Sequence, residues 1–108
     1  MNRARALKAA GLYLEMRGFN ILEQAWSLGP TKIDIIATKA DKLFFIAVEL
    51  TDTKDINKPL PSEDRLNKLV KAGSSWLDIN KYSGEFSFCL ITLDEKYRVI
   101  SFSEDLIY

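Results

Sequence analysis

Two neighbouring apolar runs, residues 31–38 and 43–51, constrain the fold of this chain more than any other feature. Both runs are rich in Ile, Val and Phe, which favour β-strands over helices. Only the short connector Lys39–Lys42 separates them. We therefore expect the two runs to pair as an antiparallel hairpin at the centre of a sheet.

The remaining segments supply the elements that would flank this hairpin. Apolar residues recur at helical spacing in residues 2–17 and again after Ser62, a residue typical of a helix N-cap. Residues 52–61 include two prolines, so we expect a loop there. Further strands are predicted at residues 19–26, 86–93 and 97–102. The order predicts an α/β fold with a mixed sheet: helix, three-strand meander, crossover helix and two strands.

The composition limits the class of protein. A chain of 108 residues, 47% of them hydrophobic, can bury one core, so we expect a single domain over residues 1–108. Fifteen Lys and Arg balance fifteen Asp and Glu, so any attraction to a polyanion must be local. Histidine is absent and there is one cysteine, which excludes histidine-based catalysis, a cysteine zinc site and an intrachain disulfide.

The sequence shows no sign of membrane association. Its longest apolar runs are far shorter than the roughly 18 residues of a membrane-spanning helix. Residues 1–5 lead into an Ala-rich helical stretch that includes Lys8 rather than into the apolar block of a signal peptide. We expect a cytoplasmic protein with no membrane partner.

Two acids interrupt the apolar runs of the predicted hairpin. If the turn is symmetric about Asp41-Lys42, Asp34 lies directly opposite Glu49, and both side chains share one face. Two carboxylates at this separation can bind a divalent cation such as Mg²⁺ or Mn²⁺, with the Leu50 carbonyl oxygen as a further ligand. Asp34, Glu49 and Leu50 are therefore candidate metal ligands.

A purely structural interpretation of the same acids is also open. In that interpretation Lys32 pairs diagonally with Glu49, while Asp34 faces water at the edge of a half-exposed sheet. The sequence alone does not decide between the two interpretations.

Three segments of the sequence resemble a known family: YLEMRGFNIL at 13–22, IDIIA at 33–37 and AVEL at 47–50. They resemble the YraN-like family of small bacterial proteins, which is similar to archaeal Holliday-junction resolvases and belongs to the PD-(D/E)XK nuclease-like superfamily. The resemblance covers nearly the whole chain and implies a restriction-endonuclease-like domain. It also implies that Asp34 is a metal-binding carboxylate and Glu49 the acid of the E-x-K signature.

The chain departs from that signature at three positions. Thr51 stands where the signature has lysine, Lys32 stands where an acid usually precedes the aspartate by two residues, and Leu7 lies near the place of a helical acid. In the symmetric register Lys32 lies opposite Thr51, so its ammonium group could fill the volume of the missing lysine. Lys32 is accordingly a candidate catalytic residue.

Local charge suggests the partner. Residues 1–18 and 54–71 each carry an excess of basic side chains, and we expect Arg3, Arg5, Lys68 and Lys71 to contact phosphates of DNA or another nucleic acid. Three functions follow. The first is a nucleic-acid-binding protein of nuclease-like fold with weak or lost hydrolysis. The second is an active Mg-dependent endonuclease on branched or single-stranded DNA that uses Lys32. The third is a non-catalytic protein-interaction module, for which a homodimer would be natural.

Overall fold

The computed structural model describes residues 2–51 and 63–106, and within them the helices and strands follow the predicted order. The elements are α1 (Arg3–Met16), β1 (Asn20–Leu28), β2 (Thr31–Lys39), β3 (Lys42–Leu50), α2 (Glu63–Asn80), β4 (Phe86–Leu93) and β5 (Val99–Ser103). The predicted α/β class is confirmed, and so is the alternation of helices and strands. The predicted loop at 52–61 and the Ser62 cap lie outside the described residues.

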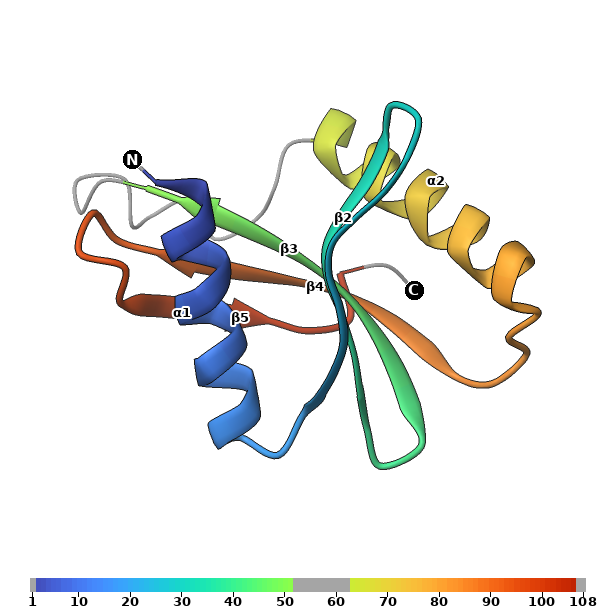
Figure 1. The fold of residues 1–108 in the computed structure, drawn as a ribbon, viewed down its shortest axis with the longest axis horizontal. Coiled ribbons are helices and arrows are strands. Elements are labelled where there is room, and N and C mark those ends of the chain that lie inside the picture. Colours follow the sequence, from blue (N-terminus) through green and yellow to red (C-terminus); the bar gives the residue numbers. More distant parts are fainter. Residues whose placement is uncertain (1, 52–62, 107–108) are drawn as a thin grey trace.

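One five-stranded mixed sheet forms the centre of the molecule, with the strands in chain order from β1 to β5 (Figure 1). β1, β2 and β3 form an antiparallel meander. β4 lies parallel to β3, and β5 returns antiparallel to β4. A parallel neighbour requires a crossover connection, and α2 lies within the segment that makes it.

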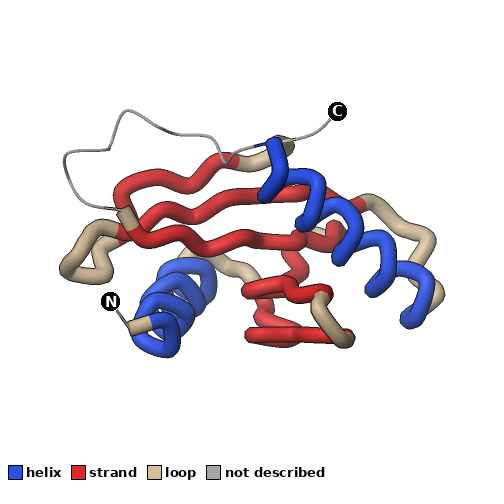
Figure 2. The backbone as a smooth tube through the Cα atoms, turned by 90° about the horizontal axis from the view of Figure 1, so that it is seen from above, coloured by secondary structure: helices blue, strands red, loops and turns tan. Residues whose placement is uncertain are grey.

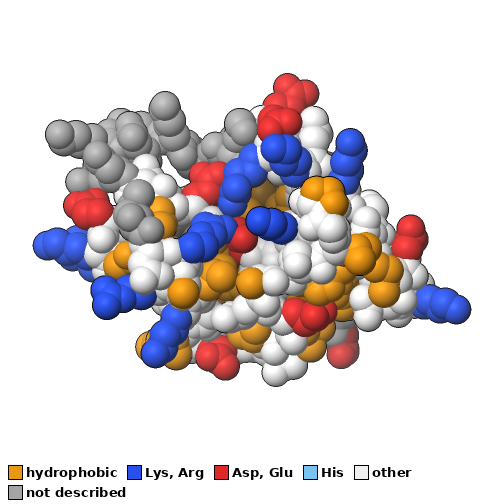
Figure 3. All heavy atoms as spheres, turned by 45° about the horizontal axis from the view of Figure 1, so that its top comes forward, with side chains coloured by type: hydrophobic (Ala, Val, Ile, Leu, Met, Phe, Trp, Pro, Cys, Tyr) orange, Lys and Arg blue, Asp and Glu red, His pale blue; other side chains and the backbone are white. Residues whose placement is uncertain are grey.

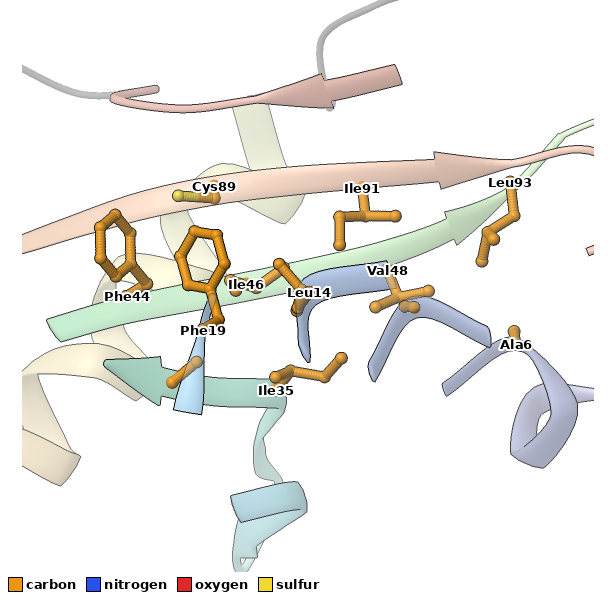
Figure 4. Packing of buried hydrophobic residues seen from close by; sticks show 12 residues of the cluster. Ala6, Leu14, Phe19, Ile35, Phe44, Ile46, Val48, Cys89, Ile91 and Leu93 are labelled. Atoms are coloured by element: carbon orange, nitrogen blue, oxygen red, sulfur yellow. The ribbon is translucent and has the colours of Figure 1, made fainter. Parts of the chain in front are cut away.

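The two faces of the sheet bury separate clusters because successive strand residues point to opposite sides. Ile35, Ile46 and Ile91 pack with Leu14 of α1 on one face, where Figure 4 also shows Phe19 and Cys89. Phe45 and Leu90, from the same strands, pack on the other face with residues of α2. Figure 2 shows the two helices separated by the strands of the sheet. No helix among the described residues is long and apolar enough to cross a membrane.

Close packing holds α2 on its face of the sheet. A Cβ atom built on Gly73 would lie 2.7 Å from Cε1 of Phe88 and 3.2 Å from Cδ2 of Phe45. These rings belong to the buried cluster, so they have little room to move. Glycine at this position therefore sets how near the helix comes to the strands.

The predicted register of the central hairpin is wrong by two residues. β2 and β3 are joined by a two-residue turn, Ala40-Asp41, and Lys39 pairs with Lys42. Both turn residues have positive φ, 51° and 61°, as in the tight turns that match the twist of two strands. Neither is glycine, so the sequence lacks the usual signal for such a turn. Thr38 consequently pairs with Leu43, and Asp34 does not lie directly opposite Glu49.

Candidate functional site: a basic cavity where two strands part

The site begins where β2 and β3 stop pairing with each other. Regular pairs between them run from Lys39 and Lys42 to Ile35 and Ile46, whereas β2 stays paired with β1 as far as Thr31. In Figure 1 the ribbon of β1 and β2 rises away from β3 toward the start of α2. Backbone groups of β3 beyond Ile46 therefore lack the partners that β2 would have supplied.

Side chains supply those partners at Val48. Its N–H donates to Oδ2 of Asp34 at 2.7 Å. Its carbonyl oxygen accepts from Nη1 of Arg3 at 2.7 Å and from Nη2 of Arg65 at 3.2 Å. Because an unpaired backbone group is costly to bury, these three side chains stabilise the point at which the strands separate.

The same two arginines neutralise both candidate acids. Nη2 of Arg3 lies 2.5 Å from Oδ1 of Asp34, and Nη2 of Arg65 lies 3.3 Å from Oδ2. Nε of Arg65 lies 2.7 Å from Oε1 of Glu49. Asp34 and Glu49 thus do come together, because a shift of two residues keeps each side chain on its own face. The structure differs from the Lys32–Glu49 pairing in the structural interpretation, because arginines provide the compensating charge.

The arginines arrive from helices on opposite faces of the sheet. Arg3 is the first residue of α1, whose N-cap, Asn2, accepts the Arg5 N–H and donates its own N–H to the Tyr97 hydroxyl. Arg65 lies in the first turn of α2. Arg65 is 31 residues from Asp34 along the chain. No local sequence signal links the two residues, so sequence analysis included Arg65 only as one charge of a basic segment.

A cavity of about 550 Å³ opens beside this network. Figure 3 shows basic side chains gathered around a hollow with acidic side chains near its centre. The described residues that line the cavity are Arg3, Pro30, Thr31, Lys32, Asp34, Ala47, Arg65, Lys68, Leu69 and Lys71. Five of them are cationic and one is acidic, so the cavity attracts anions although the chain has no net charge.

The structure brings most of the predicted site residues to this cavity. Arg3, Lys68 and Lys71, predicted as phosphate contacts, line it with Asp34 and Lys32, and Glu49 joins through Arg65. Arg5 is exposed on α1 and is not among the described residues that line the cavity. Leu50 ends β3, with its side chain against the α1 side of the core.

The prediction that Lys32 lies opposite Thr51 is wrong, because β2 and β3 pair in a different register. Lys32 pairs with Ser27 of β1, and its exposed side chain forms part of the cavity wall. The Thr51 N–H donates to the Leu93 carbonyl oxygen at 2.8 Å, which extends β3 along β4. Lys32 is therefore near Asp34 but not across from the position of the missing signature lysine.

The donor set, as it lies, does not fit a divalent cation. Both carboxylate oxygens of Asp34 and one of Glu49 contact guanidinium groups, and the two acids and two arginines together carry no net charge. Over residues 2–51 and 63–106 no group of three or more His, Cys, Asp or Glu could hold a metal ion. Binding of Mg²⁺ or Mn²⁺ stays a prediction.

Comparison with known proteins agrees with the expected family. The sequence model of the uncharacterised protein family UPF0102 matches residues 8–101. A UPF0102 protein of Flavobacterium psychrophilum is 29% identical over 100 residues, which cover 89% of this chain and 84% of that protein. The matched region contains both acids and the whole sheet except the last residues of β5.

Proposed function

The chain belongs to the UPF0102 family, and we propose that it binds nucleic acid through the basic cavity, with weak or lost phosphodiester hydrolysis. The observation that carries this proposal is the convergence of Arg3, Lys32, Arg65, Lys68 and Lys71 on one cavity in a chain of zero net charge. Lys and Arg side chains that converge in this way neutralise phosphates and release their counterions.

The state of the two acids supports weak or lost hydrolysis. Metal-assisted hydrolysis requires carboxylates that are available to a cation, whereas Asp34 and Glu49 contact arginines. Thr51 also stands where the nuclease signature has lysine. The cationic wall and the occupied acids together favour binding over cleavage.

The proposal is tested by measuring affinity for branched and single-stranded DNA over a range of salt concentrations. Lys68→Ala and Lys71→Ala should each weaken binding similarly on every DNA sequence. The slope of log K against log salt should become shallower by about 0.7 to 0.9 for each lost phosphate contact. A slope identical to that of the wild type in both variants would contradict the proposal.

Lys81→Ala is the matched control. Lys81 follows the last turn of α2 and is exposed, and the rise of the helix places it about 24 Å from Arg65 along the helix axis. We expect affinity to be unchanged in this variant. Absence of nucleic-acid affinity in the wild type at low salt would reject the proposal and leave the protein-interaction module and its homodimer as the interpretation to test.

An active endonuclease is a second candidate because Lys32 and Asp34 line the same cavity. A lysine ammonium there could stabilise the charge that develops on the phosphate. This candidate predicts Mg²⁺- or Mn²⁺-dependent cleavage of branched or single-stranded DNA that disappears in both Lys32→Gln and Asp34→Ala. Cleavage that persists in Asp34→Ala would exclude this site as its source.

A further inference from the structure

We propose that Asp34 and Glu49 act as positioning residues that hold Arg3 and Arg65 ready to bind a phosphate group, so that two guanidinium groups take the place of the divalent cation. This inference rests on the proposed function and specifies how its site works. It reverses the predicted role of the acids, because here the arginines contact the ligand and the carboxylates contact the arginines.

Several contacts hold each arginine in place. Arg3 contacts Asp34 through one terminal nitrogen and the Val48 carbonyl oxygen through the other. Arg65 contacts Asp34, Glu49 and the same carbonyl oxygen. A free arginine loses much rotamer freedom when it binds a ligand, and one already held in place loses less.

Both arginine side chains are partly exposed. The Arg3 side chain is 48% exposed and the Arg65 side chain 38%, whereas the Asp34 side chain is 19% exposed and the Glu49 side chain 33%. Both arginines line the cavity. An incoming anion can therefore reach the guanidinium groups more readily than it meets the carboxylate behind them.

The charge of the cavity favours a phosphate over a divalent cation. The charges of Arg3 and Arg65 cancel those of Asp34 and Glu49, so Lys32, Lys68 and Lys71 leave the cavity with a positive excess. A phosphate would reduce that excess. A divalent cation would increase it and would also have to displace guanidinium groups from the carboxylates.

The test compares two substitutions that each remove one negative charge, Asp34→Asn and Asp64→Asn. Asp64 lies one residue before Arg65 on α2, has a side chain that is 79% exposed and pairs with Lys68. Simple electrostatics predicts that both variants bind DNA more tightly, because each removes repulsion between like charges. The proposal predicts that Asp64→Asn binds slightly more tightly and that Asp34→Asn binds about tenfold more weakly, the equivalent of one lost charge-assisted hydrogen bond.

A double-mutant cycle separates positioning from general loss of structure. With EDTA present, Glu49→Gln should weaken binding and make the salt slope shallower in the wild-type background. In the Arg65→Gln background the same substitution should have no further effect, because the group that it positions is gone. Equal effects in both backgrounds would overturn the proposal. Circular dichroism is used to check that all four proteins are folded.

Mn²⁺ titration followed by electron paramagnetic resonance gives an independent readout. We expect no Asp34-dependent binding of Mn²⁺ to the wild type, and measurable binding once Arg3→Gln and Arg65→Gln together remove the guanidinium groups from both acids. Asp34-dependent binding to the wild type would overturn the proposal. If Lys68→Ala and Lys71→Ala weaken DNA binding but Asp34→Asn strengthens it, this inference fails while the proposed function stands.

Discussion

Two aspartates in this protein are bound in similar ways but differ in what surrounds them. Oδ1 of Asp94 accepts the N–H groups of Lys96 and Arg98 at 2.9 Å each, and its Oδ2 lies 2.8 Å from Nε of Arg98. Asp34 likewise accepts a backbone N–H and contacts guanidinium groups. The partners of Asp94 lie within four residues along the chain, whereas those of Asp34 are 14 or more residues away.

Contacts of a carboxylate with backbone N–H and guanidinium groups stabilise a turn at Asp94 and connect the residues of the cavity at Asp34. Asp94 is 2% exposed and closes the turn between β4 and β5. The N–H of Arg98, more than any other group, lowers the pKa of its carboxyl. Asp34 joins elements from both faces of the sheet and lines the basic cavity. Local contacts therefore produce an aspartate that closes a turn, and long-range contacts produce one that joins distant elements beside a cavity.

The largest effect on stability should come from Asp94→Ala. The substitution removes one acceptor for two backbone N–H groups and one guanidinium. We expect the melting temperature to fall by about 5 °C or more, while DNA affinity below the transition stays that of the wild type. Thermal unfolding followed by circular dichroism measures the first quantity and fluorescence anisotropy the second. A tenfold loss of DNA affinity in Asp94→Ala would contradict the conclusion that only Asp34 acts at the cavity.

Gly73→Ala should disturb the contacts of Arg65 with Asp34 and Glu49 and leave the turn at Asp94 unchanged. The new methyl group would meet the buried rings of Phe88 and Phe45, so α2 must move away from the sheet and carry Arg65 with it. Overpacking outweighs the gain in helix propensity, and we expect a loss of about 1 kcal/mol in the free energy of unfolding. DNA affinity should fall modestly. Ser74→Ala, at the neighbouring exposed position of the same helix, should leave both quantities unchanged.

Acid should destabilise the protein through carboxyls outside the cavity. The backbone N–H of Arg98 lowers the pKa of Asp94, and the Ser87 hydroxyl, followed by Lys42, lowers the pKa of Asp105. The unfolded chain then binds protons more readily than the folded one. The stabilisation is therefore present above about pH 4, the usual aspartate pKa, and is lost as the pH falls through the lower folded values. Melting temperatures from pH 6 to 3 should fall less steeply in Asp94→Asn.

The smallest effect on stability is expected for Asp64→Asn. Asp64 and Lys68 form an exposed pair at positions i and i+4, and such pairs contribute no more than about 0.5 kcal/mol. We expect an unchanged free energy of unfolding in urea titrations. A loss comparable to that of Asp94→Ala would show that exposure is a poor guide to the role of an acid in this fold.

Much of the fold could be predicted because its signals are local. Helical spacing in residues 2–17 and the apolar runs at 31–38 and 43–51 correspond to α1, β2 and β3. The predicted register of the β2–β3 hairpin was wrong because Ala40 and Asp41 adopt a turn in which glycine is usual. Asp34 and Lys32 could be chosen from strand periodicity and charge, and Lys68 and Lys71 from the local excess of basic residues, because both signals lie in the sequence itself.

The sequence by itself determined the order of the elements and the presence of two acids among apolar neighbours. Tertiary structure alone decided what neutralises those acids. Arg3 and Arg65 reach Asp34 from helices on opposite faces of the sheet, and their meeting depends on where β2 leaves β3. The periodicity of apolar residues reports on neighbours along the chain, whereas an ion pair depends on distance in space. The ion pairs of the cavity therefore could not be predicted from the sequence.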